Sequence, residues 1–215
     1  MRVALIHAVP MAVAPVAAAF EALWPEAERI NLLDDSLSGD RQHAGALTPA
    51  IAARIAALAD YAKACGADAI LYTCSAFGAA IETVAHASRI PVLKPNEAMF
   101  DEALAAGRRI GMLATFPPSV PGMEDEFRAQ AGAGGATITT FCVPEAMAAA
   151  RRGDMATHNA LLRDAAQRPE LAACDALMLA QFSMAPARDA VQSAARCPVL
   201  TSPESAVRRL KRLAS

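Results

Sequence analysis

The sequence predicts an α/β fold with two similar halves, each built on a parallel β-sheet. Two observations support this. Apolar runs rich in β-branched residues alternate with alanine-rich segments along all 215 residues, a pattern typical of parallel sheets covered on both faces. The chain also repeats itself at an offset of 107 residues. We therefore expect halves at residues 1–106 and 107–215, related by a pseudo-twofold axis, with the active-site cleft between them.

The elements of the first half follow from the spacing of apolar residues. Ile51, Ile55 and Leu58 recur at helical intervals, whereas the expected strands are short and continuously apolar. We expect strands at Val3–Val9, Arg29–Leu33, Asp68–Thr73 and Ile90–Leu93, and helices at Met11–Leu23, Thr48–Ala64 and Ala76–Ala87. The longest polar stretch, Ser36–Gly45, reads as a loop that would suit a mobile lid over the cleft.

The repeat is carried by residues near the strand ends. Arg2–Ile6 matches Arg109–Leu113, and Arg89-Ile90-Pro91 matches Arg196-Cys197-Pro198. Asp68 matches Asp175 in the same way, and the register is expected to hold from the first strand to the last helix. Because the segment after residue 96 leads directly into the second half, the last helix of each half is expected to cross over to the other.

Composition excludes several classes of function. Apolar residues make up 54% and charged residues 20%, which excludes disorder. The net charge of −2, without a basic run, argues against nucleic acid as a partner. No apolar run is long enough for a membrane span. The five cysteines form no C-x-x-C pair, so we expect no metal site and a reducing, cytoplasmic setting. The sequence has no glycine-rich phosphate loop, so we expect no nucleotide cofactor.

Functional residues in parallel sheets lie beyond the carboxyl ends of the strands. Cys74 occupies such a place, between a strand and the following helix, where the helix dipole and free N–H groups favour a thiolate with a lowered pKa. Ser75 and the amides after it can bind a carboxylate or an enolate oxygen. The alternative is a small buried thiol, since free cysteine is often a core residue.

Four further residues stand at comparable strand ends. Thr115 and Ser119 follow the first strand of the second half and suit a carboxylate, although Ser119 would also serve as a helix cap. His7 can act as a base or a hydrogen-bond donor, or it can be structural. Asp35 can orient Cys74 or a substrate amino group, or it can belong to a solvated turn.

The segment Leu71–Gly78, with Cys74 at its centre, resembles the first-half cysteine motif of the aspartate/glutamate/hydantoin racemase superfamily. The segment Gly111–Thr115 and the repeat extend the resemblance over the whole chain. It implies two α/β halves with a cleft at the pseudo-dyad and catalysis without a cofactor. It also implies one cysteine in each half, working on opposite faces of the carbon next to a substrate carboxylate.

The sequence departs from that pattern at one position. Cys74 matches Gln181, and glutamine neither accepts nor supplies a proton near neutral pH, although it can hydrogen-bond a carboxylate. We therefore expect a cofactor-independent, racemase- or isomerase-like enzyme with one thiol as acid/base or nucleophile, acting on a small carboxylate. A single-cysteine decarboxylase of the superfamily and a catalytically inactive small-ligand-binding protein are the alternatives. Alanine-rich helices would suit a homodimer.

Overall fold

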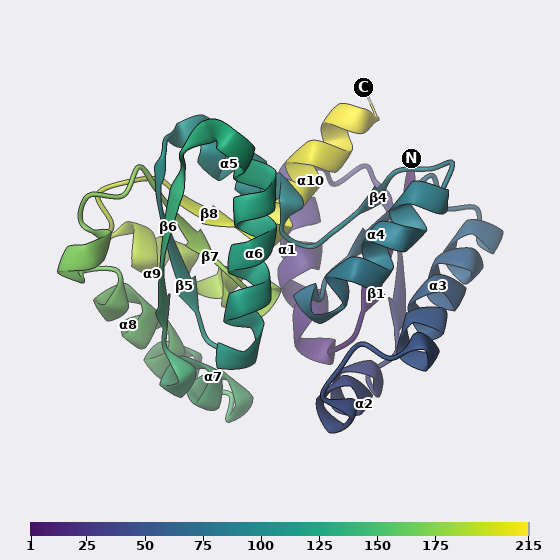
Figure 1. The fold of residues 1–215 in the computed structure, drawn as a ribbon, viewed down its shortest axis with the longest axis horizontal. Helices are drawn as coiled ribbons and strands as arrows, with labels where there is room; N and C mark the ends of the chain where they lie inside the picture. The colour runs from purple at the N-terminus through teal and green to yellow at the C-terminus, as the bar shows by residue number, and fades with distance from the viewer. Residues whose placement is uncertain (215) are drawn as a thin grey trace. The chain divides into compact units, whose positions relative to one another are not determined.

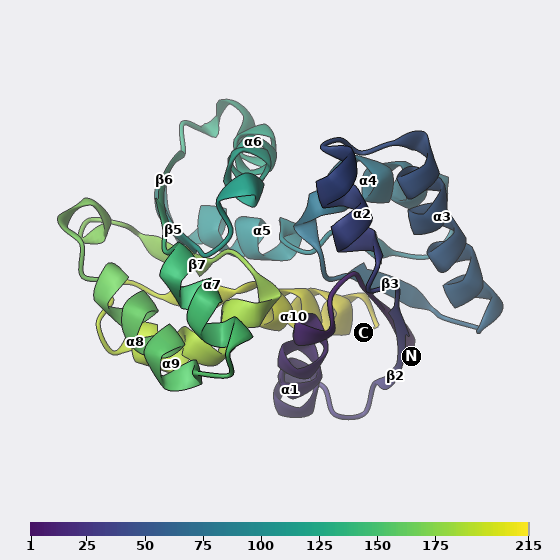
Figure 2. The same ribbon diagram turned by 90° about the horizontal axis from the view of Figure 1, so that it is seen from below.

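Two four-stranded parallel sheets organise the computed structural model, which describes residues 1–214 (Figures 1 and 2). The contacts divide the chain into two units. The first unit comprises Met1–Pro95 and the residues from Ala206 on, and the second comprises Asn96–Ser205. Each unit contains one sheet covered by helices on both faces. The predicted fold class, α/β with two similar parallel-sheet halves, is confirmed.

The first unit has the strand order β2-β1-β3-β4. Its central strands are buried on both faces because Val3–Ile6 and Ala69–Tyr72 are apolar, whereas every residue of the edge strand β2 is exposed or half-buried. The strands are β1 Arg2–His7, β2 Glu28–Leu33, β3 Ala69–Tyr72 and β4 Val92–Leu93. The helices are α1 Val13–Leu23, α2 Leu37–Ala44, α3 Pro49–Ala64 and α4 Gly78–Ala87, with 3-10 turns at Pro10–Ala12 and Ser75–Phe77.

The second unit has the equivalent strand order, β6-β5-β7-β8. Its strands are β5 Arg109–Ala114, β6 Thr137–Cys142, β7 Ala176–Leu179 and β8 Val199–Thr201. Its helices are α5 Glu97–Ala106, α6 Val120–Ala131, α7 Pro144–Arg151, α8 Met155–Ala165 and α9 Arg188–Gln192. Its 3-10 turns are Pro117–Ser119, Gly132–Gly134, Pro169–Leu171 and Phe182–Ala187. Figure 2 shows α5 and α6 on one face of this sheet and α7, α8 and α9 on the other.

Each unit has its own apolar core. In the first, Ile55 of α3 and Ile81 of α4 belong to one cluster with Ile6 and Ile70 of the sheet. In the second, Phe100 of α5 meets Phe127 of α6 edge to face, with ring centroids 5.6 Å apart. Both rings are buried, so this aromatic pair closes one face of the second sheet. None of the helices within residues 1–214 is long and apolar enough to cross a membrane.

The matching aspartates of the repeat have a structural role. The Oδ2 atom of Asp68 accepts a hydrogen bond from the backbone N–H of Arg2 at 2.7 Å, which joins the starts of β1 and β3. Asp175 Oδ2 accepts from the backbone N–H of Arg109 at 2.9 Å at the same place in the second sheet. The Arg109 side chain adds an ion pair at 2.9 Å, and these bonds lower the pKa of Asp175 to about 2.

Strand pairing corrects one expectation about the repeat. Arg2 pairs with Glu28, and its counterpart Arg109 pairs with Thr137, so Glu28 corresponds to Thr137 and not to Gly135. The expected constant register is therefore wrong for the second strand of each half. The central strands keep the offset of 107 residues, because β3 and β7 pair with β1 and β5 in matching registers. The connection from β5 to β6 is two residues longer than the connection from β1 to β2. The connection from β6 to β7 is two residues shorter than that from β2 to β3, which restores the offset.

The last helix of each repeat belongs to a different unit from the strands before it. Helix α5 packs against α6, β7 and β8 in the second unit. Helix α10, Ser202–Leu213, begins in the second unit, and its residues from Ala206 on belong to the first. There Lys211 Nζ donates to the carbonyl of Leu23 at the end of α1, at 2.8 Å. The boundary expected after residue 106 follows the repeat, whereas the contacts divide the chain after Pro95 and after Ser205.

Candidate functional site

Cys74 lies just beyond the carboxyl end of β3. Its backbone is extended (φ −126°, ψ 121°), and it precedes the 3-10 turn Ser75–Phe77 that leads into α4. The side chain is partly exposed and packs against the apolar core of the first unit, where Tyr72 and Phe77 are buried on either side of it in the chain. The residue therefore lies at the edge of the core, with its sulfur largely removed from water.

Burial raises the pKa of the Cys74 thiol above its ordinary value. The backbone N–H of Ala76 and the hydroxyl of Ser38 act in the opposite direction, but more weakly. The expected lowering of this pKa is therefore wrong. A three-residue 3-10 turn supplies only a small dipole, and removing the sulfur from water outweighs it. At neutral pH the thiol is protonated.

The polar segment expected as a loop and lid is mostly helical, since Leu37–Ala44 forms α2. Ser38 Oγ on this helix donates to the carbonyl of Ala8 at 3.0 Å. Arg54 of α3 binds both Asp34, just before the turn that enters the helix, and Asp40, in the first turn of the helix. These bonds position the Ser38 hydroxyl beside Cys74.

Asp35 lies in the turn between β2 and α2, and it is exposed. Its neighbour Asp34 is the residue bound by Arg54, and the same carboxylate accepts from the Ser36 hydroxyl at 2.7 Å. Ser75, next to Cys74, is partly exposed. Both predicted residues therefore stand at the carboxyl edge of the first sheet, and Ser75 is the one adjacent to the thiol.

His7 is completely buried at the end of β1. Its Nδ1 lies 2.9 Å from Thr73 Oγ1, and its Nε2 lies 3.0 Å from Asn31 Oδ1. Burial lowers the pKa of the ring, so it is neutral near pH 7. In that form Nε2–H donates to Asn31, and Nδ1 accepts from the Thr73 hydroxyl. The expected substrate contact loses its support, because both nitrogens link β1 to its neighbouring strands.

Three of the predicted residues come together in the second unit. Gln181 Oε1 accepts from the backbone N–H of Thr115 at 3.0 Å and lies 3.2 Å from its hydroxyl. Gln181 Nε2 donates to Ser119 Oγ at 3.1 Å, and Ser119 Oγ donates to the carbonyl of Phe116 at 2.8 Å. The amide of Gln181 therefore holds the loop after β5 in place.

Cys74 and Gln181 occupy equivalent positions. Each stands two residues beyond a central strand, has an extended backbone and precedes a 3-10 turn. The angles of Gln181 are φ −115° and ψ 147°. The structure thus supports the sequence match between a thiol and an amide that transfers no proton.

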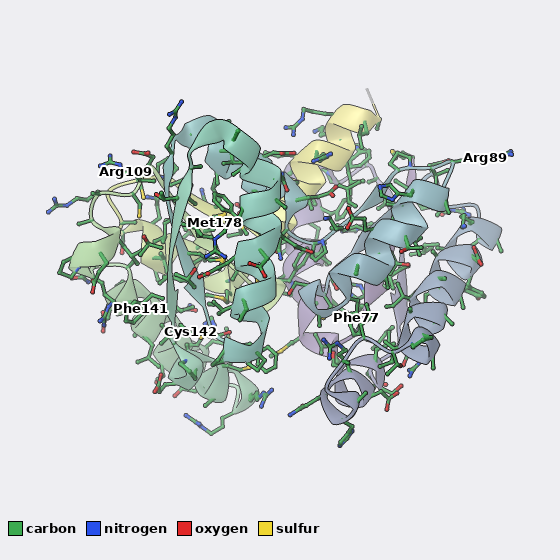
Figure 3. The ribbon with its side chains drawn as sticks, viewed as in Figure 1. Phe77, Arg89, Arg109, Phe141, Cys142 and Met178 are labelled. Atoms are coloured by element: carbon green, nitrogen blue, oxygen red, sulfur yellow. The ribbon has the colours of Figure 1, made fainter. Side chains whose placement is uncertain are left out.

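A pocket of about 370 Å³ adjoins the Thr115 loop at the carboxyl edge of the second sheet. The loop after β5 and helix α7 form its walls. Its lining consists of Thr115, Phe116, Pro117, Pro144, Met147, Ala148 and Arg151. The lining residues from α7 were not among those predicted from the sequence. The signal for them was Cys142, labelled in Figure 3, because it ends β6 and places the following helix at this edge.

Within residues 1–214, no group of three or more His, Cys, Asp or Glu side chains is arranged to hold a metal ion. The candidate groups are a thiol and hydroxyls at the sheet edge of the first unit, and hydroxyls, an amide and one arginine at that of the second.

The family model for Asp/Glu/Hydantoin racemase matches residues 12–138, which is more than half of the chain. The chain belongs to the Asp/Glu/Hydantoin racemase family. Comparison with curated proteins finds no significant match.

Solved structures with the same fold include racemases of this family. Allantoin racemase from Klebsiella pneumoniae is 15% identical with a TM-score of 0.78, and the match covers 100% of this chain and 87% of that one. PH1733, an aspartate racemase homologue from Pyrococcus horikoshii OT3, is 14% identical with a TM-score of 0.77 over 99% and 98% of the two chains. A cysteine variant of arylmalonate decarboxylase is 19% identical with a TM-score of 0.69 over 100% and 93%.

Proposed function

We propose that this member of the racemase family is a cofactor-independent enzyme that acts at the carbon next to the carboxylate of a small substrate. Cys74 is its acid/base or nucleophilic group. The observation that carries the proposal is the pair of equivalent positions, one with a free cysteine and the other with Gln181, whose amide is already hydrogen-bonded.

One thiol restricts the chemistry. As a thiolate, Cys74 can remove the α-proton, and the electron pair passes into the carboxylate to give an enediolate. As a thiol, it can return a proton to the α-carbon on the same face. Inversion needs a second proton carrier, and Gln181 is not one. Racemisation or isomerisation would therefore use water or a substrate group on the other face.

The raised pKa of Cys74 favours the acid step. Loss of CO₂ from a substituted malonate also leaves an enediolate, and this reaction needs only a proton donor to complete it. A thiol that is protonated at neutral pH is suited to that task. Decarboxylation is therefore the second candidate reaction, and the fold shared with arylmalonate decarboxylase is compatible with it.

Each unit has its own groups that suit an anion. Ser75 and the backbone after it are adjacent to Cys74 in the chain. In the second unit, Thr115 and Arg151 line the same pocket, so an anionic group there meets a hydroxyl and a guanidinium. Met147 and Phe116 would contact an apolar substituent.

The test is a survey of small carboxylates and disubstituted malonates in heavy water, followed by NMR. Deuterium at the α-carbon reports proton transfer, and loss of a carboxylate reports decarboxylation. We expect Cys74→Ser to reduce the rate by about a thousandfold, in line with the loss of an acid/base group. Cys142→Ser is the matched control and should change it by about twofold or less. Equal activity of the two variants would contradict the proposal.

A protein that binds carboxylates without turnover is the remaining alternative, and the occupied amide of Gln181 favours it. Saturable binding of a carboxylate by the wild type, with no exchange or decarboxylation for any compound, would identify it.

A further inference from the structure

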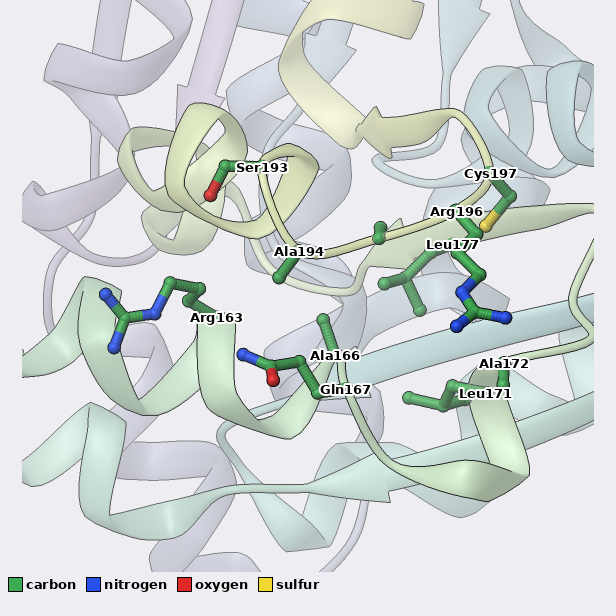
Figure 4. A pocket seen from close by; sticks show the side chains of 11 residues that line it. Arg163, Ala166, Gln167, Leu171, Ala172, Leu177, Ser193, Ala194, Arg196 and Cys197 are labelled. Carbon is green, nitrogen blue, oxygen red and sulfur yellow. The ribbon is translucent and has the colours of Figure 1, made fainter.

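A second pocket lies in the second unit, at the edge of the sheet opposite to Gln181. It is formed where β7 and β8 begin, between the end of α8 and the loop that joins α9 to β8 (Figure 4). Its volume is about 460 Å³, which is in the range of small-molecule sites. None of the residues assigned to the candidate functional site lines it.

The floor of this pocket is apolar. Ala166, Leu171 and Leu177 line it and are 6%, 4% and 1% exposed. They come from the residue that caps α8, from the 3-10 turn after it and from β7, so the floor is part of the packed core. A compact hydrocarbon group resting on it would be removed from water.

The walls are positively charged. Arg163 lies in the last turn of α8, Gln167 lies in the turn that follows this helix, and Arg196 stands on the loop across the pocket. No carboxylate is among the lining residues. Arg163 is engaged by its neighbour Asp164 at 2.8 Å, whereas Arg196 forms no ion pair with any residue that the structure describes. The guanidinium of Arg196 is therefore the available cation.

We propose that this pocket binds a small monocarboxylate that carries a compact apolar group, such as a single ring or a branched chain. The guanidinium of Arg196 binds the carboxylate, because its planar fork matches the two oxygens. Arg163 adds positive charge, and the Gln167 amide can donate a further hydrogen bond. The apolar group lies on Ala166, Leu171 and Leu177.

Benzoate is the probe for this site, and its binding to the full chain is followed by calorimetry. We expect saturable binding that Arg196→Gln weakens about tenfold or more, the usual cost of losing a charged hydrogen bond. Ala195→Leu, which fills the pocket with an apolar side chain, should weaken it as well. The matched control is Arg89→Gln, which removes the equivalent arginine of the first repeat and the same charge, and should change affinity by about twofold or less.

Cys197 lines the pocket and reports where benzoate binds. Benzoate should slow alkylation of Cys197 by iodoacetamide in the wild type but not in Arg196→Gln, while Cys74 remains unprotected. Three results would overturn the proposal. They are the absence of saturable binding, equal weakening by the two arginine variants, and protection of Cys74 instead of Cys197. Because the readout is independent of turnover, failure here leaves the proposed function of Cys74 untouched.

Discussion

The two units share one topology, but their central strands are linked differently. In the first unit, His7 joins Asn31 and Thr73 by hydrogen bonds, so β1, β2 and β3 are connected by side chains at their carboxyl ends. The position equivalent to His7 in the second unit is Ala114, which pairs with Cys142 as His7 pairs with Leu33. Thr140, equivalent to Asn31, has a buried hydroxyl with no partner within residues 1–214.

The second unit has its polar link one layer further out, where Gln181 binds Thr115 and Ser119. In the first unit that layer holds Cys74. The first unit has its polar link at His7, below Cys74, and leaves the Cys74 thiol available. The second unit has no such link, and its equivalent side chain, Gln181, holds the loop after β5 in place. Residues that set the topology, such as Asp68 and Asp175, are the same in both units, so the fold is preserved while the chemistry of the strand ends differs.

The largest expected effect comes from making the two positions chemically alike. Gln181→Cys supplies a second thiol at the position equivalent to Cys74, and we expect racemisation of a chiral substrate to rise by about a hundredfold, the usual contribution of an acid/base group. Polarimetry or chiral chromatography measures it. Gln181→Ser is the control, because it removes the same hydrogen bonds to Thr115 and Ser119 without adding a thiol. A folded Gln181→Cys protein with no gain would show that the equivalence is only structural.

The link in the first unit should contribute strongly to stability. His7→Ala removes a buried ring and leaves two hydrogen-bond partners unmatched, so we expect the free energy of unfolding to fall by about 3 kcal/mol. Urea unfolding at pH 8 measures this. If His7 were merely solvated at the edge of the sheet, the loss would be below about 0.5 kcal/mol.

The pH dependence of stability tests the same residue. Because burial lowers the pKa of His7 below its ordinary value of 6.5, the unfolded chain takes up a proton first as the pH falls. The contribution of His7 is therefore complete above pH 6.5 and is lost as the pH drops through the folded pKa. We expect the wild type to lose more stability between pH 8 and pH 5 than His7→Gln does. Equal slopes would contradict a buried neutral ring.

A smaller effect is expected at Ser38, which lowers the pKa of Cys74 against the effect of burial. Ser38→Ala should raise that pKa further, so less thiolate is present at pH 8 and alkylation of Cys74 slows about two- to tenfold, the equivalent of one hydrogen bond. In both proteins the rate should still be rising above pH 9. An unchanged profile would remove Ser38 from the environment of the thiol.

The smallest effect is expected at Thr140 of the second unit. Thr140→Val keeps the shape of the side chain and removes a buried hydroxyl that has no described partner, so we expect stability to rise by up to about 1 kcal/mol. Asn31→Leu, the equivalent change in the first unit, should instead lower it. Thermal unfolding of the two variants compares them directly.

The fold could be predicted from the sequence because the central strands are strongly apolar and because the aspartates that join them, Asp68 and Asp175, recur in the repeat. The sequence was also sufficient to bring Thr115, Ser119 and Gln181 to one sheet edge, since each follows a central strand. The helix α2 could not be predicted, because Leu37–Ala44 is polar and the approach to it is anchored by ion pairs from Arg54, which is distant in the sequence.

Two features of the site depend on packing that a linear pattern does not contain. The pKa of Cys74 is governed by removal from water and by Ser38, a residue from another element. Arg151 enters the pocket beside Thr115 only because α7 follows β6 at that edge. In both cases the local sequence identified the strand end and not the neighbours that surround it.

The division of α10 between the units has a consequence for how the protein is made. Asn96–Ser205 is one continuous stretch, so the whole second unit is synthesised before the residues from Ala206 on. The first unit is translated earlier but lacks a covering segment until those residues emerge. Its exposed apolar surface during that interval would be a natural point of engagement for chaperones.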